Sequence, residues 1–211
     1  MSSLAQMLSE GIQALSIDLA ASQQKALVDY IGLMGKWNKV YNLTALREPE
    51  QMLNQHILDC LAALPPLRKR FPGSCKLLDV GAGGGLPSVV FAIACPQWRV
   101  TAVDAVAKKS AFIQTTAHTL GLINLQSVHA RVEKMHGEFD VVTCRAFATL
   151  KDFCESSRHV LHKDGLLLSL KAKLTKEEML EVPTGIHIEK IESINVPGLA
   201  VERCLVWMKP V

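Results

Sequence analysis

At 211 residues, 49% of them hydrophobic and 20% charged, the chain has the length and composition of an ordinary globular protein with a substantial core. Its net charge of +3 is spread along the sequence, no basic tail marks a nucleic-acid binder, and no apolar run approaches membrane-spanning length. The six cysteines form no C-x-x-C pair and lie mostly in apolar runs, so we expect buried thiols in a cytoplasmic protein.

The first third of the chain, residues 1–66, is predicted to be a helical extension packed on the rest. Ser22 suits a helix N-cap, and apolar side chains recur at three- and four-residue spacing over 27–37. The polar segment 38–44 interrupts that period, and a second long helix is expected over 48–65. The extension is therefore predicted to consist of helices and connections.

Polar residues at the ends of these helices are not explained by an apolar packing face. His56 and Asp59, three residues apart, would share one side of the second helix. Such a pair is more often a local structural contact than a catalytic one. We nevertheless expect both, with Asn38, Asn42 and Thr44, to flank the substrate side of a binding site.

The first predicted strand, 76–80, runs into a glycine-rich turn at 81–85, and Pro87 then suits the first turn of a helix. Such glycines bring the backbone close to a ligand. A dinucleotide fingerprint needs a third glycine where Leu86 stands. The turn better fits the loop that binds S-adenosylmethionine (SAM), with Asp79 facing the methionine ammonium. A plain tight connection is the alternative.

A second predicted strand, 99–103, ends at Asp104. An acid about 20 residues beyond the first glycine of such a loop accepts hydrogen bonds from ribose hydroxyls. Aspartate also caps helices, and a helix is expected to follow, so both roles are open. We favour the ribose contact.

From residue 67 onward the chain is predicted to be a SAM-dependent methyltransferase domain of class I, with an α/β, Rossmann-like sheet. Strands that alternate with helices predict a mostly parallel sheet. Further strands are expected at 125–129, 139–144 and 165–171, and helices near 87–95, 106–120 and 149–161. A last helix is expected after Thr175, followed by strands at 186–194 and 199–208. Their short connection requires an antiparallel hairpin.

Ligands in such sheets lie beyond the carboxyl ends of the strands, so residues just past each strand are candidates for the site. After the third strand, the backbone of 131–133 is predicted to read the adenine edge, with Glu133 accepting from its amine. Arg145 directly follows the fourth strand, where an arginine suggests a carboxylate, a phosphate or a base as partner. The alternative is an ion pair with a neighbouring helix acid. His159 and His162 have no third ligand nearby, and no metal site is predicted.

Several motifs together resemble, in order, the bacterial family of 16S rRNA methyltransferases known as RsmG or GidB. They are Trp37-Asn38 with Asn42-Leu43-Thr44, His56-Ile57-Leu58-Asp59, Leu78 to Pro87, Arg131-Val132-Glu133 and Arg145-Ala146-Phe147-Ala148. The resemblance implies methyl transfer from SAM to N7 of guanine 527 in 16S rRNA of the small ribosomal subunit. The chain departs from the family pattern at Ser88, where a glycine is usual, and in the looser stretch 103–109.

The resemblance also assigns roles to individual residues. The family's SAM contacts fall on Gly81, Leu86, Val132, Glu133 and Arg145, to which the loop and strand positions add Asp79, Gly83 and Asp104. Arg145, His56 and Asp59 are expected to position the substrate. We expect a monomer that uses SAM without a metal.

Guanine N7 has a lone pair and no proton, so its methylation needs positioning rather than a general base. The Asn/Asp-Pro-Pro-aromatic motif of amine methylation is absent after the fourth strand, where Thr143-Cys144-Arg145-Ala146 stands. Methylation of cytosine at C5 would need a cysteine nucleophile, and Cys144 keeps that alternative open. The remaining alternative is a regulator that binds SAM or RNA without turnover.

Overall fold

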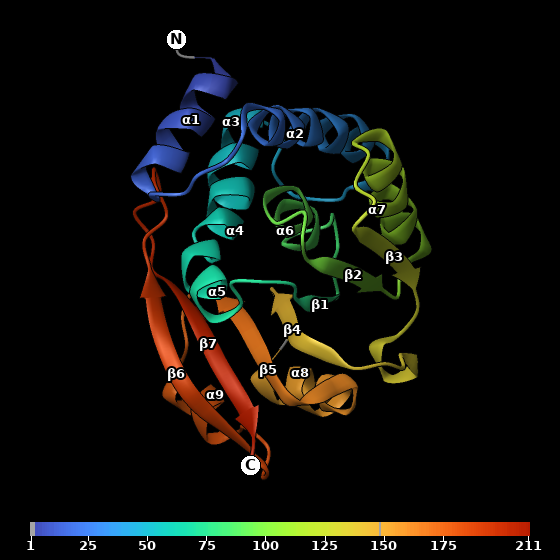
Figure 1. Ribbon diagram of the computed structural model, residues 1–211, viewed down its shortest axis with the longest axis vertical. Coiled ribbons are helices and arrows are strands. Elements are labelled where there is room, and N and C mark those ends of the chain that lie inside the picture. The colour runs from blue at the N-terminus through green and yellow to red at the C-terminus, as the bar shows by residue number, and fades with distance from the viewer. Residues whose placement is uncertain (1–2, 148) are drawn as a thin grey trace.

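The computed structural model describes residues 3–147 and 149–211, so Ala148 of the last motif lies outside the described residues. Seven strands in this part of the chain form one sheet, in the order β3-β2-β1-β4-β5-β7-β6 (Figure 1). Their bounds are β1 Lys76–Val80, β2 Arg99–Asp104, β3 Leu125–His129, β4 Phe139–Arg145, β5 Leu161–Lys171, β6 Ile186–Ile194 and β7 Arg203–Pro210. Strands β1 to β5 pair in parallel, and β7 pairs antiparallel with both β5 and β6. The predicted parallel sheet with a C-terminal antiparallel hairpin is confirmed.

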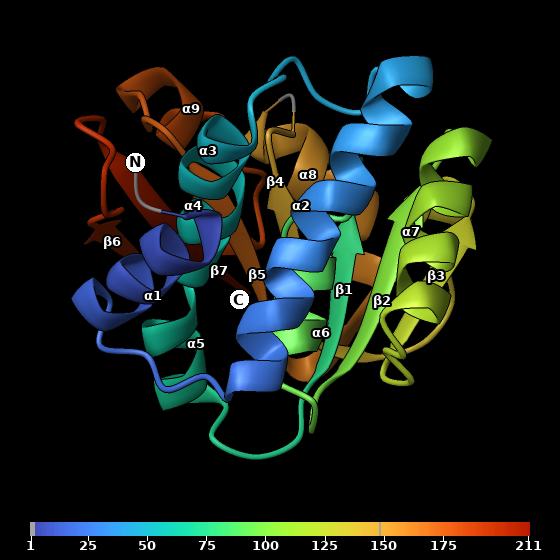
Figure 2. The ribbon, with the colours of Figure 1, turned by 90° about the horizontal axis from the view of Figure 1, so that it is seen from above.

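Helices cover both faces of the sheet (Figures 1 and 2). On one side lie α1 (Leu4–Ala14), α2 (Ala21–Tyr41), α3 (Pro49–Met52), α4 (Asp59–Leu61), α5 (Leu64–Arg70), α6 (Ser88–Ala94) and α7 (Ala107–Thr119); on the other lie α8 (Leu150–Ser157) and α9 (Lys176–Leu180). Strand residues alternate between the two layers, so that Leu77 joins the core under the first group and Leu78 the core under α8. No helix among the described residues is long and apolar enough to cross a membrane.

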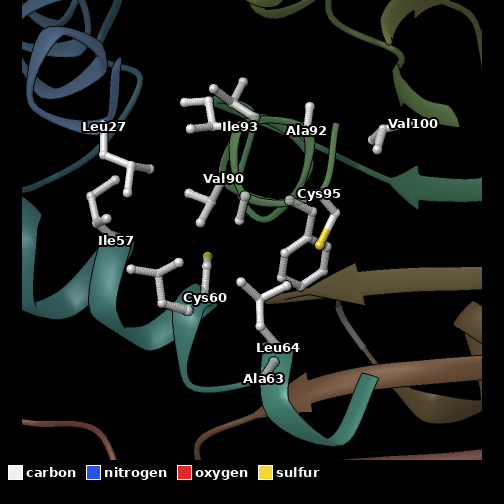
Figure 3. Close-up of a cluster of buried hydrophobic side chains, with 14 of the residues drawn as sticks. Leu27, Ile57, Cys60, Ala63, Leu64, Val90, Ala92, Ile93, Cys95 and Val100 are labelled. Carbon is white, nitrogen blue, oxygen red and sulfur yellow. The ribbon is translucent and has the colours of Figure 1, made fainter. Parts of the chain in front are cut away.

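The N-terminal helices share their core with the sheet. Leu27 of α2 and Ile57 face Val90 and Ile93 of α6 (Figure 3), and Val100 of β2 belongs to the same cluster of buried side chains. Helix α6 therefore lies between the extension and the sheet, buried along its whole length. One apolar core continues from residues 1–66 into the rest of the chain.

The second long helix differs from the single helix expected over 48–65. The segment consists of α3, a π-helical turn at Leu53–Leu58, the short α4, and α5. Prolines in the first turn of α5 cannot donate a backbone hydrogen bond to the preceding turn, so they interrupt the helix and begin a new one. The segment 68–70 is consequently helical, and Arg68 donates from Nη2 to the carbonyl of Ala94 at 2.6 Å, at the end of α6. The basic residues Arg68-Lys69-Arg70 are thus not a solvated linker, since the Arg68 side chain is bound within the protein.

Three predicted boundaries shift. Pro87 is the residue before α6 rather than part of its first turn. Strand β5 begins at Leu161, four residues early, where Gly165 permits an irregular register against Phe139, because a side chain at Gly165 would lie 2.8 Å from the Phe139 carbonyl. Strand β7 begins at Arg203 rather than at 199, because the connection turns around Gly198 at φ +76° and buries Val196.

Candidate functional site

The glycine-rich loop after β1 is attached to the end of β2. The N–H groups of Gly81 and Ala82 donate to the Val103 carbonyl at 2.9 and 3.1 Å. The N–H of Gly83 donates to Asp104 Oδ2 at 2.9 Å. Gly81 and Gly83 have φ of +67° and +59°, in the left-handed region that favours glycine. The loop conformation therefore depends on these glycines and on the Asp104 carboxylate.

Asp104 is buried and combines the two roles considered for it. Its Oδ1 accepts from the N–H of Val106 at 2.8 Å, which orders the chain just before α7. Each carboxylate oxygen has a second lone pair, so both still have capacity for ribose hydroxyls. The helix contact is observed, and the ribose contact stays a prediction.

A cavity of about 150 Å³ lies beside this loop, at the carboxyl ends of β1, β2 and β3. Four of the predicted cofactor residues line it: Gly81, Asp104, Val132 and Glu133. Phe147, which no prediction assigned to a role, also lines it. The structure thus brings the loop, the ribose acid and the adenine segment to one place.

The other predicted cofactor residues are not among the described residues that line this cavity. Gly83 lies behind it on Asp104, and Leu86 packs, partly buried, against the main apolar core. Arg145 lines a second, neighbouring cavity of about 300 Å³, together with Asp59 and Phe147. Phe147 is therefore a wall common to both cavities.

Asp79 is fully buried at the end of β1. Its Oδ2 accepts from the N–H of Ser88, the first residue of α6, at 3.0 Å. Its Oδ1 has no hydrogen-bond partner in the described part of the chain. Burial raises the pKa of this carboxyl to about 7, although the Ser88 hydrogen bonds and the charge of Arg145 lower it. An unsatisfied carboxylate oxygen beside the glycine loop fits an ammonium partner.

Asp79→Asn is expected to stabilise the protein at about pH 8 and to change stability little near pH 4. The folded-state pKa lies above the unfolded value, so the folded protein holds more protons across the window from about 4 to about 7, and stability falls as pH rises through it. Asparagine keeps a cap for α6 without the buried charge, for a gain of roughly 1–3 kcal/mol above pH 7. Urea unfolding of the wild type and the variant at both pH values measures the change in the free energy of unfolding. An equal change at both pH values would show that Asp79 carries no buried charge at pH 8.

Helix α2 contacts the glycine loop directly. The fully buried Tyr30 donates its hydroxyl hydrogen to the Gly84 carbonyl at 2.5 Å. A side chain at Gly85 would lie 2.5 Å from Val89 and 3.3 Å from the Tyr30 hydroxyl, which explains glycine at that position. Sequence reasoning counted Tyr30 only as part of an apolar helix face, because the spacing gives no sign of its hydroxyl contact.

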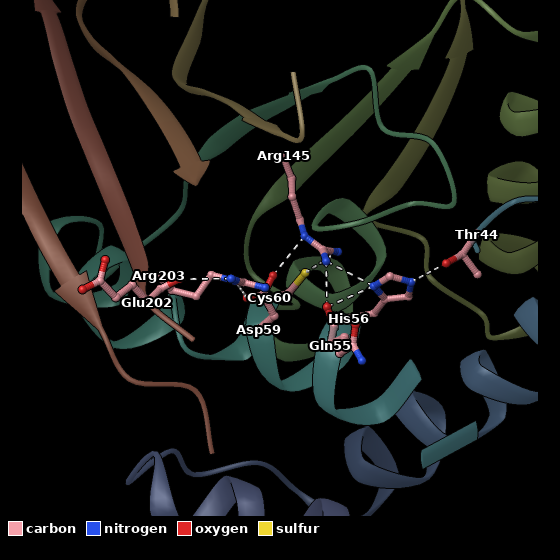
Figure 4. Close-up of polar contacts among 8 residues, drawn as sticks. All are labelled: Thr44, Gln55, His56, Asp59, Cys60, Arg145, Glu202 and Arg203. Atoms are coloured by element: carbon pink, nitrogen blue, oxygen red, sulfur yellow. Dashed lines mark hydrogen bonds and ion pairs between the residues drawn. The ribbon is translucent and has the colours of Figure 1, made fainter. Parts of the chain in front are cut away.

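A chain of polar contacts runs from Thr44 through His56, Arg145 and Asp59 to Arg203 (Figure 4). Arg145 Nε pairs with Asp59 Oδ2 at 3.0 Å, and Arg203 Nε donates to Asp59 Oδ1 at 2.6 Å. Asp59 is 5% exposed and the two arginines 17% and 20%. The predicted alternative for Arg145, an ion pair with a helix acid, is present in the structure.

The π-helical turn supplies two further partners of Arg145. Arg145 Nη2 donates to the Gln55 carbonyl at 2.7 Å and to His56 Nδ1 at 3.1 Å. Nη1 is near only Cys60 Sγ, at 4.0 Å, among the described atoms within hydrogen-bond range. Both protons of Nη2 are thus used inside the protein, whereas the Nη1 donors remain for a ligand. π-turns of this kind occur often at functional sites.

His56 is neutral at physiological pH. Burial, together with the charge of Arg145, lowers the pKa of its imidazole to about 4. In the tautomer whose Nδ1 accepts from Arg145, Nε2–H donates to Thr44 Oγ1 at 2.7 Å; in the other tautomer, Nδ1–H donates to the Gln55 carbonyl at 3.0 Å and Nε2 accepts from the Thr44 hydroxyl. His56 therefore positions Arg145 and carries no charge of its own.

The polar segment 38–44 holds Thr44 in place. Asn38 is buried, accepts from the Thr44 N–H at 2.9 Å and donates to the Leu46 carbonyl at 2.8 Å. Asn42 ends α2 in the left-handed conformation, with φ +48°. The structure thus joins Asn38, Thr44, His56 and Asp59 to one network, whereas Asn42 reaches it through Arg47, whose Nη2 donates to the Asn42 amide oxygen.

Cys144 is fully buried in the core beneath α8, with its thiol 3.5 Å from Ser169 Oγ. Burial raises the pKa of this thiol far above its usual value. A nucleophilic cysteine needs access and a lowered pKa, so the structure disfavours the cytosine alternative. No cluster of three or more potential metal ligands occurs among residues 3–147 and 149–211.

Comparison with known proteins identifies the family. The model of the GidB family, described as rRNA small subunit methyltransferase G, matches residues 23–206. The chain is 51% identical to a protein of Acidovorax sp. (strain JS42) named Ribosomal RNA small subunit methyltransferase G, over 97% of this chain and 94% of that protein. It is 48% identical to a protein of the same name from Methylibium petroleiphilum, again over 97% of this chain and 94% of that protein.

Solved structures show the same fold at low identity. TrmN from Thermus thermophilus superposes with a TM-score of 0.56 at 16% identity, over 75% of this chain and 53% of that one. The glycopeptide N-methyltransferase MtfA superposes with a TM-score of 0.61 at 14% identity, over 74% of this chain and 98% of that one. These likenesses confirm the predicted class I methyltransferase fold. From the extent of the family match and the identity of its relatives, the chain belongs to the GidB family of rRNA small subunit methyltransferases.

Proposed function

We propose that this chain transfers a methyl group from SAM to N7 of guanine 527 in 16S rRNA of the small ribosomal subunit, acting as a monomer in the cytoplasm. One observation supports this most. One polar network joins motifs that are far apart in the chain, those around Thr44, His56, Asp59 and Arg145. It lies beside the cavity lined by Gly81, Asp104, Val132 and Glu133, which we call the cofactor cavity. A generic SAM-binding domain has no need of that network.

The chain's own groups would hold SAM as follows. Asp104 accepts from the ribose hydroxyls, and the segment at Val132 and Glu133 contacts the adenine. The backbone of the glycine loop, from Gly81 through Gly83 to Leu86, would contact the cofactor. The Oδ1 atom of Asp79 receives the ammonium. Nη1 of Arg145 donates to the carboxylate, since its other nitrogens are engaged within the protein.

When bound, SAM supplies a methyl carbon whose bond to sulfur breaks as the N7 lone pair attacks, leaving a neutral thioether and a cationic 7-methylguanine. N7 carries no proton, so no residue has to act as a base. The site agrees with this, because the lowered pKa of His56 makes its imidazole a weak base and both carboxylate oxygens of Asp59 contact arginines. The protein's contribution is then to position the two reactants and to exclude water.

Asp104→Ala is expected to weaken SAM binding by about tenfold or more. The change removes acceptors for the ribose and frees the N–H of Gly83, and hydrogen bonds to a charged group contribute about 1.5–3 kcal/mol. Titration calorimetry measures the affinity. Asp140→Ala is the matched control, because Asp140 also accepts from a backbone N–H, that of Lys76, but at the amino ends of the parallel strands, away from the cavity. Unchanged affinity in folded Asp104→Ala protein would remove the ribose assignment.

The function itself is tested by mapping 7-methylguanine in small-subunit rRNA from cells with and without the gene. We expect the modification at one guanine, lost in the deletion strain and restored by the wild-type chain. Purified protein with radiolabelled SAM, offered either free 16S rRNA or assembled small subunits, shows which form is the substrate. Label on a cytosine carbon would favour the cysteine mechanism, and SAM binding without transfer to any RNA would favour a regulator.

A further inference from the structure

The cavity of about 300 Å³ beside the cofactor cavity is enclosed by the carboxyl ends of β4 and β5 and by the hairpin. Its lining includes Phe147, the ion-paired group of Asp59, Arg145 and Arg203, and two lysines, Lys171 and Lys173. The volume is at the low end of ligand pockets, which run from about 300 to 1,000 Å³. It suits one nucleotide rather than a helical segment of RNA.

Phe147 lines both this cavity and the cofactor cavity. The preceding residue, Ala146, has φ +56°, a left-handed conformation that costs residues other than glycine on the order of 1–3 kcal/mol. This turn places the Phe147 ring against Gly81, where a Cβ would lie 3.6 Å from it, and against the buried Phe153, with ring centroids 5.8 Å apart. The ring is supported by the protein yet only partly buried. Exposed aromatic faces of this kind are platforms for unstacked bases.

The charges that line this cavity fit an anion. Among the described residues that line the cavity, four are basic and one, Asp59, is acidic. Lys171 is paired with Glu178 at 2.5 Å, and Arg145 and Arg203 share Asp59. Lys173 is exposed, and no carboxylate in the described part of the chain pairs with it. A partly buried aromatic ring and an unpaired cation that line the same cavity match a base and its phosphate.

We propose that this cavity holds the target guanosine flipped out of the rRNA, with the base stacked on Phe147 and an adjoining phosphate bound by Lys173. The inference rests on the proposed function and names the acceptor site for it. The base would then lie at the border of the two cavities that Phe147 lines, where N7 can meet the methyl donor. Phe147 and Lys173 are thus assigned to RNA binding.

The test separates stacking from packing. Phe147→Leu keeps an apolar side chain on Gly81 and Phe153 but removes the ring, and Phe147→Tyr keeps the ring. We expect Phe147→Leu to raise the KM for small-subunit rRNA by about tenfold, with SAM affinity by calorimetry within about threefold of wild type, and Phe147→Tyr to restore the KM. An unchanged rRNA KM in Phe147→Leu, or an equal loss of SAM affinity, would overturn the assignment.

Lys173→Ala is expected to raise the KM for rRNA. It should also lower the slope of a plot of log KM against log salt concentration by about 0.7–0.9, which is the contribution of one lost phosphate contact. Lys163→Ala is the control. Lys163 is also an exposed lysine, but it lies near the start of β5, whereas the cavity is at the other end of that strand. An unchanged salt slope in Lys173→Ala would remove the phosphate contact. Wild-type protein that makes 7-methylguanine while both variants behave as wild type would leave the proposed function intact and refute only this site.

Discussion

Replacement of Asp59 by alanine is expected to lower the free energy of unfolding by about 3–5 kcal/mol, because it leaves Arg145 and Arg203 side by side, largely buried and without their shared counter-ion. For a chain of this size that corresponds to a fall in melting temperature of roughly 6–20 °C. Chemical unfolding followed by circular dichroism measures the loss. Methyl transfer should disappear in the same variant even at temperatures where it is folded, since Arg145 loses its orientation.

The matched control is Asp29→Ala. Asp29 also forms a salt bridge, with Lys25 at 2.6 Å, but both side chains are exposed, and such pairs contribute less than about 1 kcal/mol. A loss at Asp59 no larger than the loss at Asp29 would show that the Asp59 site is more hydrated than its burial indicates.

Arg145→Lys should reduce kcat/KM for rRNA methylation by about a hundredfold or more, although it keeps the charge. One ammonium cannot contact Asp59, the Gln55 carbonyl and His56 Nδ1 in the fixed planar arrangement of a guanidinium. Two lost hydrogen bonds of a charged group, at about 1.5–3 kcal/mol each, account for a factor of that size. Kinetics with small-subunit rRNA measure it. Arg99→Lys, at an exposed position at the start of β2, should be neutral.

Calorimetry with SAM alone then separates the two anions considered for Arg145. Weaker SAM binding in Arg145→Lys supports the proposed contact of Nη1 with the methionine carboxylate. Intact SAM binding with a raised rRNA KM would assign Arg145 to an RNA phosphate instead. Full activity would show that the site needs only a positive charge beside Asp59.

The glycine loop and Asp104 were predictable because their signals are local. A strand, a glycine turn and an acid at a fixed distance lie within one βαβ unit, and the structure brings Gly81 and Asp104 to one cavity. The antiparallel hairpin was predictable for a similar reason, since a short connection permits no crossover. The order of β7 and β6 and the start of β7 depend on pairing with β5, which no local pattern encodes.

The polar network was predictable only in part. His56, Asp59 and Arg145 were expected near one another, but their joint contact requires the π-helical turn and a fold that brings Arg145 to His56, 89 positions away in the chain. Arg203 was missed entirely: it lies 144 positions from Asp59 and was expected in the middle of a strand. Phe147 was noticed only as a letter in a motif, because its place between two cavities depends on the left-handed turn at Ala146.

The hydrogen bond from Tyr30 to Gly84 makes the N-terminal helices a partner in cofactor binding by thermodynamic linkage. Whatever orders the glycine loop must also favour the docked position of α2, so SAM should slow amide hydrogen exchange in α2, far along the chain from any residue that touches it. The converse also holds. A fragment that begins at residue 67 would expose the face of α6 that Leu27 and Ile57 cover, and would leave the loop without the contact that orders it.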